Sequence, residues 1–77
     1  MQTATAAART LPLKVNGLPE ALEATTVADL LRAKGLDPER KGIAVAVNGS
    51  VVPRRIWAQA TLAAGDAVEI IEAKQGG

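Results

Sequence analysis

The chain has 77 residues, a length that allows one domain with a modest hydrophobic core. It contains no cysteine and no histidine, which excludes disulfide bonds, thiolate or imidazole metal ligands and the commonest general base. The net charge of +1 and a single aromatic residue, Trp57, supply neither the cationic surface nor the stacking rings that nucleic-acid binding requires. We therefore expect an aliphatic core, no metal site and no nucleic-acid partner.

Residues 1–10, MQTATAAART, are small, polar and free of acidic side chains. They lack the apolar segment of a secretory signal, so we expect a flexible N-terminal arm. No apolar run approaches the roughly 20 residues that a membrane-spanning helix needs. A soluble, cytoplasmic protein without a membrane partner is therefore expected.

The first predicted elements form a β-hairpin. Apolar and other residues alternate over 11–15, which is the pattern of a strand with one buried face. Asn16 and Gly17 both tolerate a positive φ and predict a tight turn. The segment 18–23 returns as a second strand, in which Pro19 lacks a backbone donor and therefore favours the edge of a sheet.

A short helix of roughly two and a half turns is predicted next. Thr26 is a plausible N-cap, and Asp29 follows three residues later as a weaker partner than the usual glutamate. The apolar side chains that share one helical face are Val27, Leu30 and Leu31. Gly35 suits the position after the helix, where Leu36 closes the end with an apolar contact. Asp37 and Pro38 then start a loop or single turn.

A second hairpin and a final strand complete the chain. The segment 43–47, IAVAV, alternates between larger and smaller apolar residues, and Asn48-Gly49 predicts another tight turn. Val51 and Val52 open a short return strand that Pro53 limits. The segment 54–60 is expected to be irregular or a single helical turn, with Trp57 capping one end of the core. Val68 and Ile70 then mark the buried face of the last strand.

This order of elements predicts an α+β domain, a mixed sheet packed on one helix. It is the order of the ubiquitin-like β-grasp fold, in which the last strand lies beside the first in the centre of the sheet. We expect the domain to span residues 11–73. Residues 74–77 would then leave it as a free C-terminal Gly-Gly tail.

The tail residues Lys74, Gln75, Gly76 and Gly77 would reach about 14 Å when extended. Glycine has no Cβ, so a narrow channel can close around it and the terminal carboxyl group stays unhindered. The tail is therefore either a chemical handle or a chance ending without function. No paired carboxylates or other catalytic constellation stand out elsewhere, and no phosphate loop is present.

The sequence resembles the sulfur carrier proteins of thiamin (thiazole) biosynthesis. The matching stretches are VNG at 15–17, TVADLL at 26–31, VAVNGSVVPR at 45–54, LAAGDAVEII at 62–71 and QGG at 75–77. The resemblance covers nearly everything from Leu11 to Gly77. It implies that the chain is a protein cosubstrate rather than an enzyme.

The resemblance also implies the chemistry and the partners. An E1-like adenylating enzyme would consume ATP to convert the Gly77 carboxylate into an acyl-adenylate, and the chain itself would bind no cofactor. A sulfur donor such as a cysteine desulfurase would then replace AMP and leave a thiocarboxylate. Thiazole synthase would take that sulfur.

A docking surface for these partners is predicted on the sheet. Ala44, Ala46 and Ile71 are expected on the face opposite the helix, where small apolar residues favour a shallow interface over isolated exposed residues. The resemblance implies that the partners dock on the exposed sheet face, which supports this interpretation. Arg54 is added as a basic rim for an acidic partner, although a solvated turn is the alternative. Lys74 either pairs with an acid of the adenylating enzyme or only aids solubility.

Three rival functions stay open. The small subunit of molybdopterin synthase shares the fold and the Gly-Gly ending, but the VNG and QGG contexts favour thiazole. A ubiquitin-like modifier would use the same carboxylate to form covalent adducts on lysines. A plain interaction domain would lose nothing if Gly76 and Gly77 were deleted.

Overall fold

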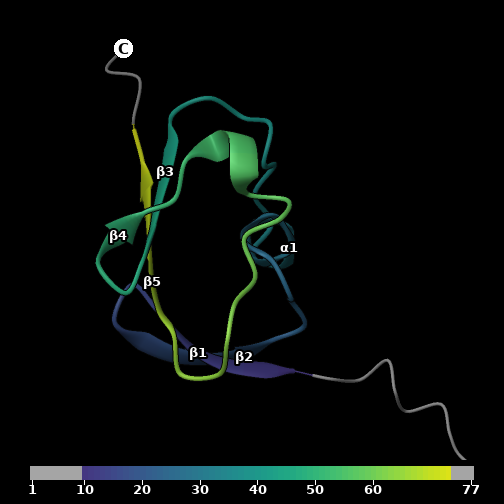
Figure 1. Cartoon of the computed structure of the whole chain (residues 1–77), viewed down its shortest axis with the longest axis vertical. Helices are drawn as coiled ribbons and strands as arrows, with labels where there is room; N and C mark the ends of the chain where they lie inside the picture. The colour runs from purple at the N-terminus through teal and green to yellow at the C-terminus, as the bar shows by residue number, and fades with distance from the viewer. Residues whose placement is uncertain (1–9, 74–77) are drawn as a thin grey trace, which may run out of the picture.

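Five strands and one α-helix make up the part of the chain that the computed structural model describes, residues 10–73 (Figure 1). The elements are β1 (Leu11–Val15), β2 (Leu18–Leu22), α1 (Val27–Ala33), β3 (Ile43–Val47), β4 (Ser50–Val51), the 3-10 turn η2 (Arg54–Ile56) and β5 (Ala67–Glu72). The predicted arm, apart from Thr10, and the predicted tail of Lys74, Gln75, Gly76 and Gly77 lie outside the described residues.

The strands form one mixed sheet in the order β2-β1-β5-β3-β4. β5 is the central strand, parallel to β1 and antiparallel to β3. β2 lies at one edge, which confirms the position predicted from Pro19. The mixed sheet with one helix confirms the predicted β-grasp architecture, with the last strand beside the first.

The two Asn-Gly turns are hydrogen-bonded to the central strand. Asn16 and Asn48 adopt φ values of 52° and 51°, as the predicted tight turns require. The Asn16 side-chain oxygen accepts a hydrogen bond from the Ile70 amide at 2.8 Å. The Asn48 side-chain oxygen accepts from the Ala67 amide at 2.9 Å. Both hairpins therefore hold β5 through their turn side chains as well as through the sheet.

The N-terminus of α1 is capped by Thr26, as predicted. Its hydroxyl oxygen accepts a hydrogen bond from the Asp29 amide at 3.1 Å. The Asp29 carboxylate does not return to the Thr26 backbone, as a capping box would. It accepts instead from the Thr25 hydroxyl at 2.8 Å and from the Thr25 amide.

The C-terminus of α1 closes with a Schellman motif. Gly35 has a φ of 81°, and its amide donates to the Arg32 carbonyl at 2.9 Å. The Leu36 amide donates to the Leu31 carbonyl at 2.8 Å. The helix ends at Ala33 and has seven residues, so it is shorter than the predicted two and a half turns.

The core lies between the sheet and α1. Its buried members are Leu13, Val15, Val27, Ala28, Leu30, Leu31, Ile43, Val45, Trp57, Val68 and Ile70. Trp57 is only 3% exposed, and its indole N–H donates to the Val52 carbonyl at 2.8 Å. The prediction that Trp57 belongs to the core is confirmed.

The Asp29 hydrogen bonds give the folded state a pH-dependent term. The bonds from Thr25 lower the pKa of the Asp29 carboxyl below its ordinary value of 3.8. The carboxylate therefore stabilises the fold above that pH and loses its contribution as the pH falls through the lowered pKa. We expect Asp29→Asn to reduce the free energy of unfolding at neutral pH and to reduce it less in acid. Urea unfolding of both proteins at both pH values measures this, and a pH-independent difference would contradict it.

Candidate functional site

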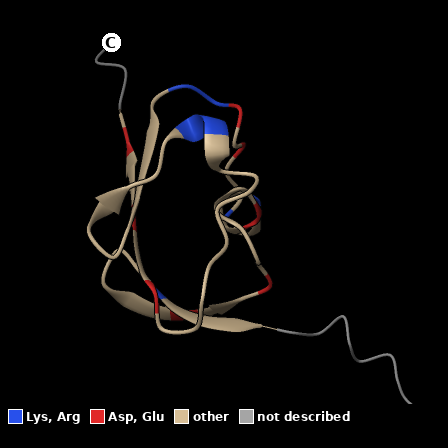
Figure 2. Cartoon of the chain, in the orientation of Figure 1, with Lys and Arg blue, Asp and Glu red and all other residues tan. Residues whose placement is uncertain are grey.

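The C-terminal end of β5 is the point from which the candidate tail continues. The Ala73 amide donates to the Gly42 carbonyl at 2.7 Å, so the chain is held to the start of β3 up to the last described residue. Figure 2 shows that the basic segments of η2 and of the loop before β3 lie at this same end of the molecule. The tail therefore begins at a point that is fixed on the body of the domain.

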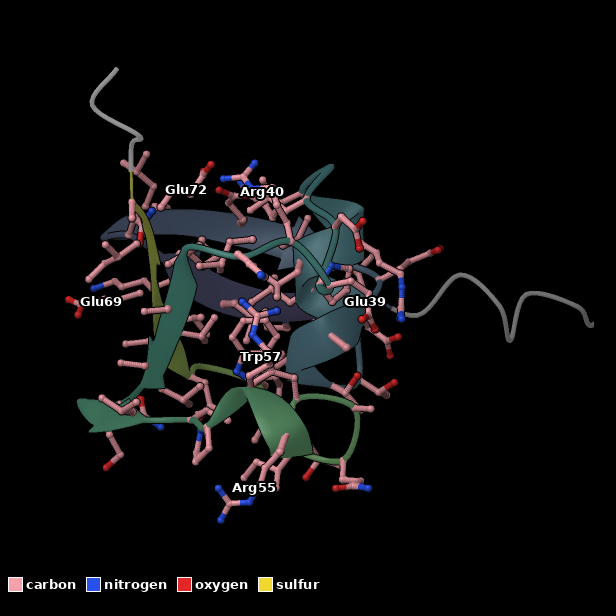
Figure 3. All side chains as sticks on the ribbon, turned by 90° about the horizontal axis from the view of Figure 1, so that it is seen from above. Glu39, Arg40, Arg55, Trp57, Glu69 and Glu72 are labelled. Atoms are coloured by element: carbon pink, nitrogen blue, oxygen red, sulfur yellow. The ribbon has the colours of Figure 1, made fainter. Side chains whose placement is uncertain are left out.

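We call the last two described residues, Glu72 and Ala73, from which the tail continues, the exit. An ion pair lies there. Arg40 Nη2 is 2.7 Å from Glu72 Oε1, and Figure 3 shows the two side chains next to each other. Both side chains are close to half exposed. The pair joins the last residue of β5 to the loop that precedes β3.

Three of the predicted site residues share the sheet face opposite the helix. Ala44 lies directly across from Ile71 in the ladder, and Ala46 lies across from both Glu69 and Val51. Side chains of residues that are directly opposed in a ladder point to the same face. Ala44 and Ile71 are exposed, whereas Ala46 is half-buried. The prediction that these residues lie on the uncovered face is confirmed.

We call this surface the outer sheet face. The strand register assigns to it Pro12, Lys14, Pro19, Ala21, Ala44, Ala46, Val51, Ala67, Glu69 and Ile71. Lys14 and Glu69 are its charged members, and Glu69 points away from the body in Figure 3. The others are small or apolar, and Ile71 is 63% exposed. None of the described residues covers this face, which makes it the candidate docking surface.

Arg54 does not lie with the other three. Its guanidinium donates to the carbonyls of Pro38 and Arg40, the latter at 2.7 Å. It also lies 4.5 Å from the centre of the Trp57 ring. The structure therefore gives Arg54 contacts within the chain, on the side of the sheet that carries the helix.

Residues 10–73 include no group of three or more acidic side chains that could hold a metal ion. Their ionisable groups are either exposed or partly exposed, and the core contains none. Nor does any helix within these residues combine the length and the apolar character that crossing a membrane demands.

The residues at the exit were missed by the sequence analysis. Arg40 and Glu72 are 32 residues apart, and no local pattern couples them. The one sequence signal for Gly42 is that it is a glycine before a strand, which many turn glycines share; in the structure its φ is 85°.

The comparisons with known proteins agree with the fold. The ThiS family model matches residues 8–77. The crystal structure of a thiamine biosynthesis protein, ThiS from Geobacter metallireducens, is 31% identical with a TM-score of 0.71, and covers 87% of this chain and 100% of its own. The solution structure of a thiamine biosynthesis protein from the same organism gives the same identity and TM-score, and covers 87% of this chain and 88% of its own. No curated protein matches the chain by sequence.

Proteins of the matched family carry sulfur and work with partner enzymes. The match spans almost the whole chain, including all of the described sheet and helix. The chain therefore belongs to the ThiS family, the small sulfur carrier proteins of thiamin biosynthesis, and is a carrier rather than a catalyst.

Proposed function

We propose that this chain carries its sulfur as a thiocarboxylate on Gly77. An adenylating enzyme joins the carboxylate to AMP from ATP, and pyrophosphate leaves. The persulfide of a sulfur donor such as a cysteine desulfurase then displaces AMP to form an acyl disulfide, and a thiol cleaves that bond, leaving the thiocarboxylate and a disulfide. Thiazole synthase takes the sulfur, and an oxygen atom from its substrates or from water replaces it, which returns the chain to its carboxylate form.

The observation that carries the proposal is the junction between β5 and the tail, taken together with the family. β5 is paired on both sides, and the Ala73 amide is bonded to Gly42, so the four residues that follow start from a rigid body. Extended, they reach about 14 Å. A partner's channel of that depth could take the carboxyl group while the domain stays outside.

The carrier leaves the catalytic groups to its partners. The sequence has no histidine and no cysteine, so it contributes neither the usual general base nor a persulfide of its own. ATP is consumed in the adenylating enzyme, and the chain binds no cofactor.

The partners dock on the outer sheet face. Ala44 and Ala46 are small, so a partner's backbone can approach the sheet closely, and Ile71 offers an apolar anchor on the last strand. This face continues along β5 to the exit. Docking there sets the tail at the entrance of the partner's site.

Ile71→Asp tests the docking surface. We call the conversion of the Gly77 carboxylate into the thiocarboxylate charging. We expect its kcat/KM to fall by about 30-fold through a higher KM, because an unpaired aspartate buried in the interface costs on the order of 2 kcal/mol. The free energy of unfolding should change by less than about 0.5 kcal/mol, as is usual for exposed positions. Steady-state charging assays and urea unfolding measure the two effects.

Leu18→Asp is the matched control. Leu18 is 64% exposed, like Ile71, but it lies at the end of the edge strand β2 and outside the outer sheet face. We expect Leu18→Asp to undergo charging with the same kcat/KM as the unsubstituted chain. Equal losses in both variants would exclude the outer sheet face as the docking site.

Sulfur transfer tests the final acceptor. The charged chain, incubated with thiazole synthase and its other substrates, should yield thiazole and recover its carboxylate. A thiocarboxylate that persists there would contradict transfer to thiazole synthase.

A further inference from the structure

The loop of residues 37–42 joins the exit of the tail to the core. At its far end, the Gly42 carbonyl accepts from the Ala73 amide at 2.7 Å, and Arg40 binds Glu72 at the same distance. Two successive residues of the exit are thus held by one loop. Ala73 is the last residue before the tail.

The loop itself has a defined shape. The Asp37 side chain accepts from the Glu39 amide at 2.8 Å, and the Asp37 carbonyl accepts from the Arg40 amide at 2.9 Å. Pro38 occupies the second position of this turn, where its fixed φ is favoured. The turn therefore presents the Pro38 and Arg40 carbonyls in a fixed direction.

Arg54 fastens this turn to the core. Its planar fork donates to both carbonyls at once, and its face lies over the Trp57 ring. Trp57 is buried and bonded to the Val52 carbonyl. Contacts therefore run without a break from the buried indole through Arg54 and the turn to Glu72 and Ala73.

A contribution to the free energy of unfolding does not by itself explain these contacts between the loop, Arg54 and the exit. The side chains of Arg40 and Glu72 are 47% and 43% exposed, and ion pairs that exposed contribute little to folding. The shared feature of the contacts is their location at the exit. They fix where the tail begins rather than how the core packs.

We propose that Arg54, Arg40, Gly42 and Glu72 form a clasp that positions the C-terminal tail for charging. This inference rests on the proposed function at Gly77. When the clasp opens, Ala73 joins the tail, which lengthens from four residues to five, while Glu72 keeps its pairing with Ile43 in the ladder. The extended reach of the tail then grows to about 17 Å, and the point from which it starts is no longer fixed.

Docking of the outer sheet face on the partner and delivery of the terminal carboxyl group into its site are separate steps, so opening of the clasp should affect the KM and the kcat differently. The outer sheet face still docks when the clasp is open, so the KM changes little. Fewer docked complexes hold the carboxyl group in the partner's site, because ordering each added residue costs a factor of roughly five or more. The kcat should therefore fall by about fivefold when the clasp opens part of the time.

Arg54→Lys and Arg40→Gln test the clasp in the full chain. Lysine keeps the charge of Arg54 but cannot donate to both carbonyls from a planar fork. We expect hydrogen exchange at the Ala73 amide to quicken by about tenfold or more in each variant, since opening of the exit exposes it. The Asn16 and Ile70 amides, which donate to the Val68 carbonyl and to the Asn16 side chain, should keep their protection. The kcat of charging should fall while the KM holds.

The double variant Arg40→Glu with Glu72→Arg reverses the ion pair. It should show the Ala73 amide protection and the kcat of the unsubstituted chain.

Gly65→Ala is the control for general destabilisation, because Gly65 has a φ of 88° and precedes β5 at the end opposite the exit. It should lower stability without selective exchange at Ala73. Unchanged exchange at Ala73 in the clasp variants, or a similar loss of kcat in Gly65→Ala, would overturn the clasp. Failure of the unchanged chain to become charged would instead overturn the proposed function, while the exchange data still decide whether the clasp holds.

Discussion

Deletion of Gly77 is expected to abolish charging while leaving the free energy of unfolding unchanged. The new terminal carboxyl group would belong to Gly76 and would fall about 3.5 Å short of its place in the partner's site. A displacement of even about 1 Å can cost a hundredfold in rate, so this one should leave no measurable adenylation. Pyrophosphate release by the adenylating enzyme measures the effect. Stability should be unaffected because the described core residues end at Ile70.

Gly77→Ala is the matched control for this deletion. It keeps a terminal carboxyl group at the same distance from Ala73 and adds only a Cβ. We expect reduced but measurable charging, because the added methyl group crowds a channel shaped for glycine. Normal pyrophosphate release with the deletion variant would contradict a reaction at Gly77.

Replacement of Trp57 by alanine is expected to destabilise the fold by about 3–5 kcal/mol. A domain of this size has a total stability of roughly 3–10 kcal/mol, so most of it would be lost. Trp57 is the only aromatic residue in the sequence, and it is buried between the sheet and α1 (Figure 3). Its removal leaves a cavity, the Val52 carbonyl without its donor and Arg54 without its platform.

Trp57→Phe separates packing from the hydrogen bond. Phenylalanine keeps a ring in the core but cannot donate to Val52, so we expect a loss of about 1–2 kcal/mol. Urea unfolding followed by far-ultraviolet circular dichroism compares the three proteins without depending on tryptophan fluorescence. An alanine variant as stable as the phenylalanine variant would contradict the structural role given to the ring.

The strands and turns could be predicted because their signals are local. Alternation over 11–15 and 43–47 identified two strands, and the Asn-Gly pairs identified both hairpins. The uncovered position of Ala44 and Ile71 followed from the same alternation. The sheet order depends on long-range pairing, and the ubiquitin-like order of elements supplied it.

The contacts at the exit could not be predicted because they join distant segments. Arg54 and the Arg40 carbonyl are 14 residues apart, and the direction of the intervening chain decides whether they meet. The sequence showed a charge beside Trp57 but not that its guanidinium turns toward the helix side. Asp29 likewise had two nearby donors, and the backbone geometry before α1 selected Thr25 over Thr26.

The intact mass of the full chain after incubation with its adenylating enzyme, ATP and a sulfur source tests the central claim most directly. We expect a mass gain equal to the exchange of one oxygen atom for sulfur, with fragmentation locating the change at Gly77. An unchanged mass, with an adenylating enzyme shown to be active on another sulfur carrier protein, would contradict the thiocarboxylate. Covalent adducts on the lysines of other proteins in place of that gain would identify a modifier instead.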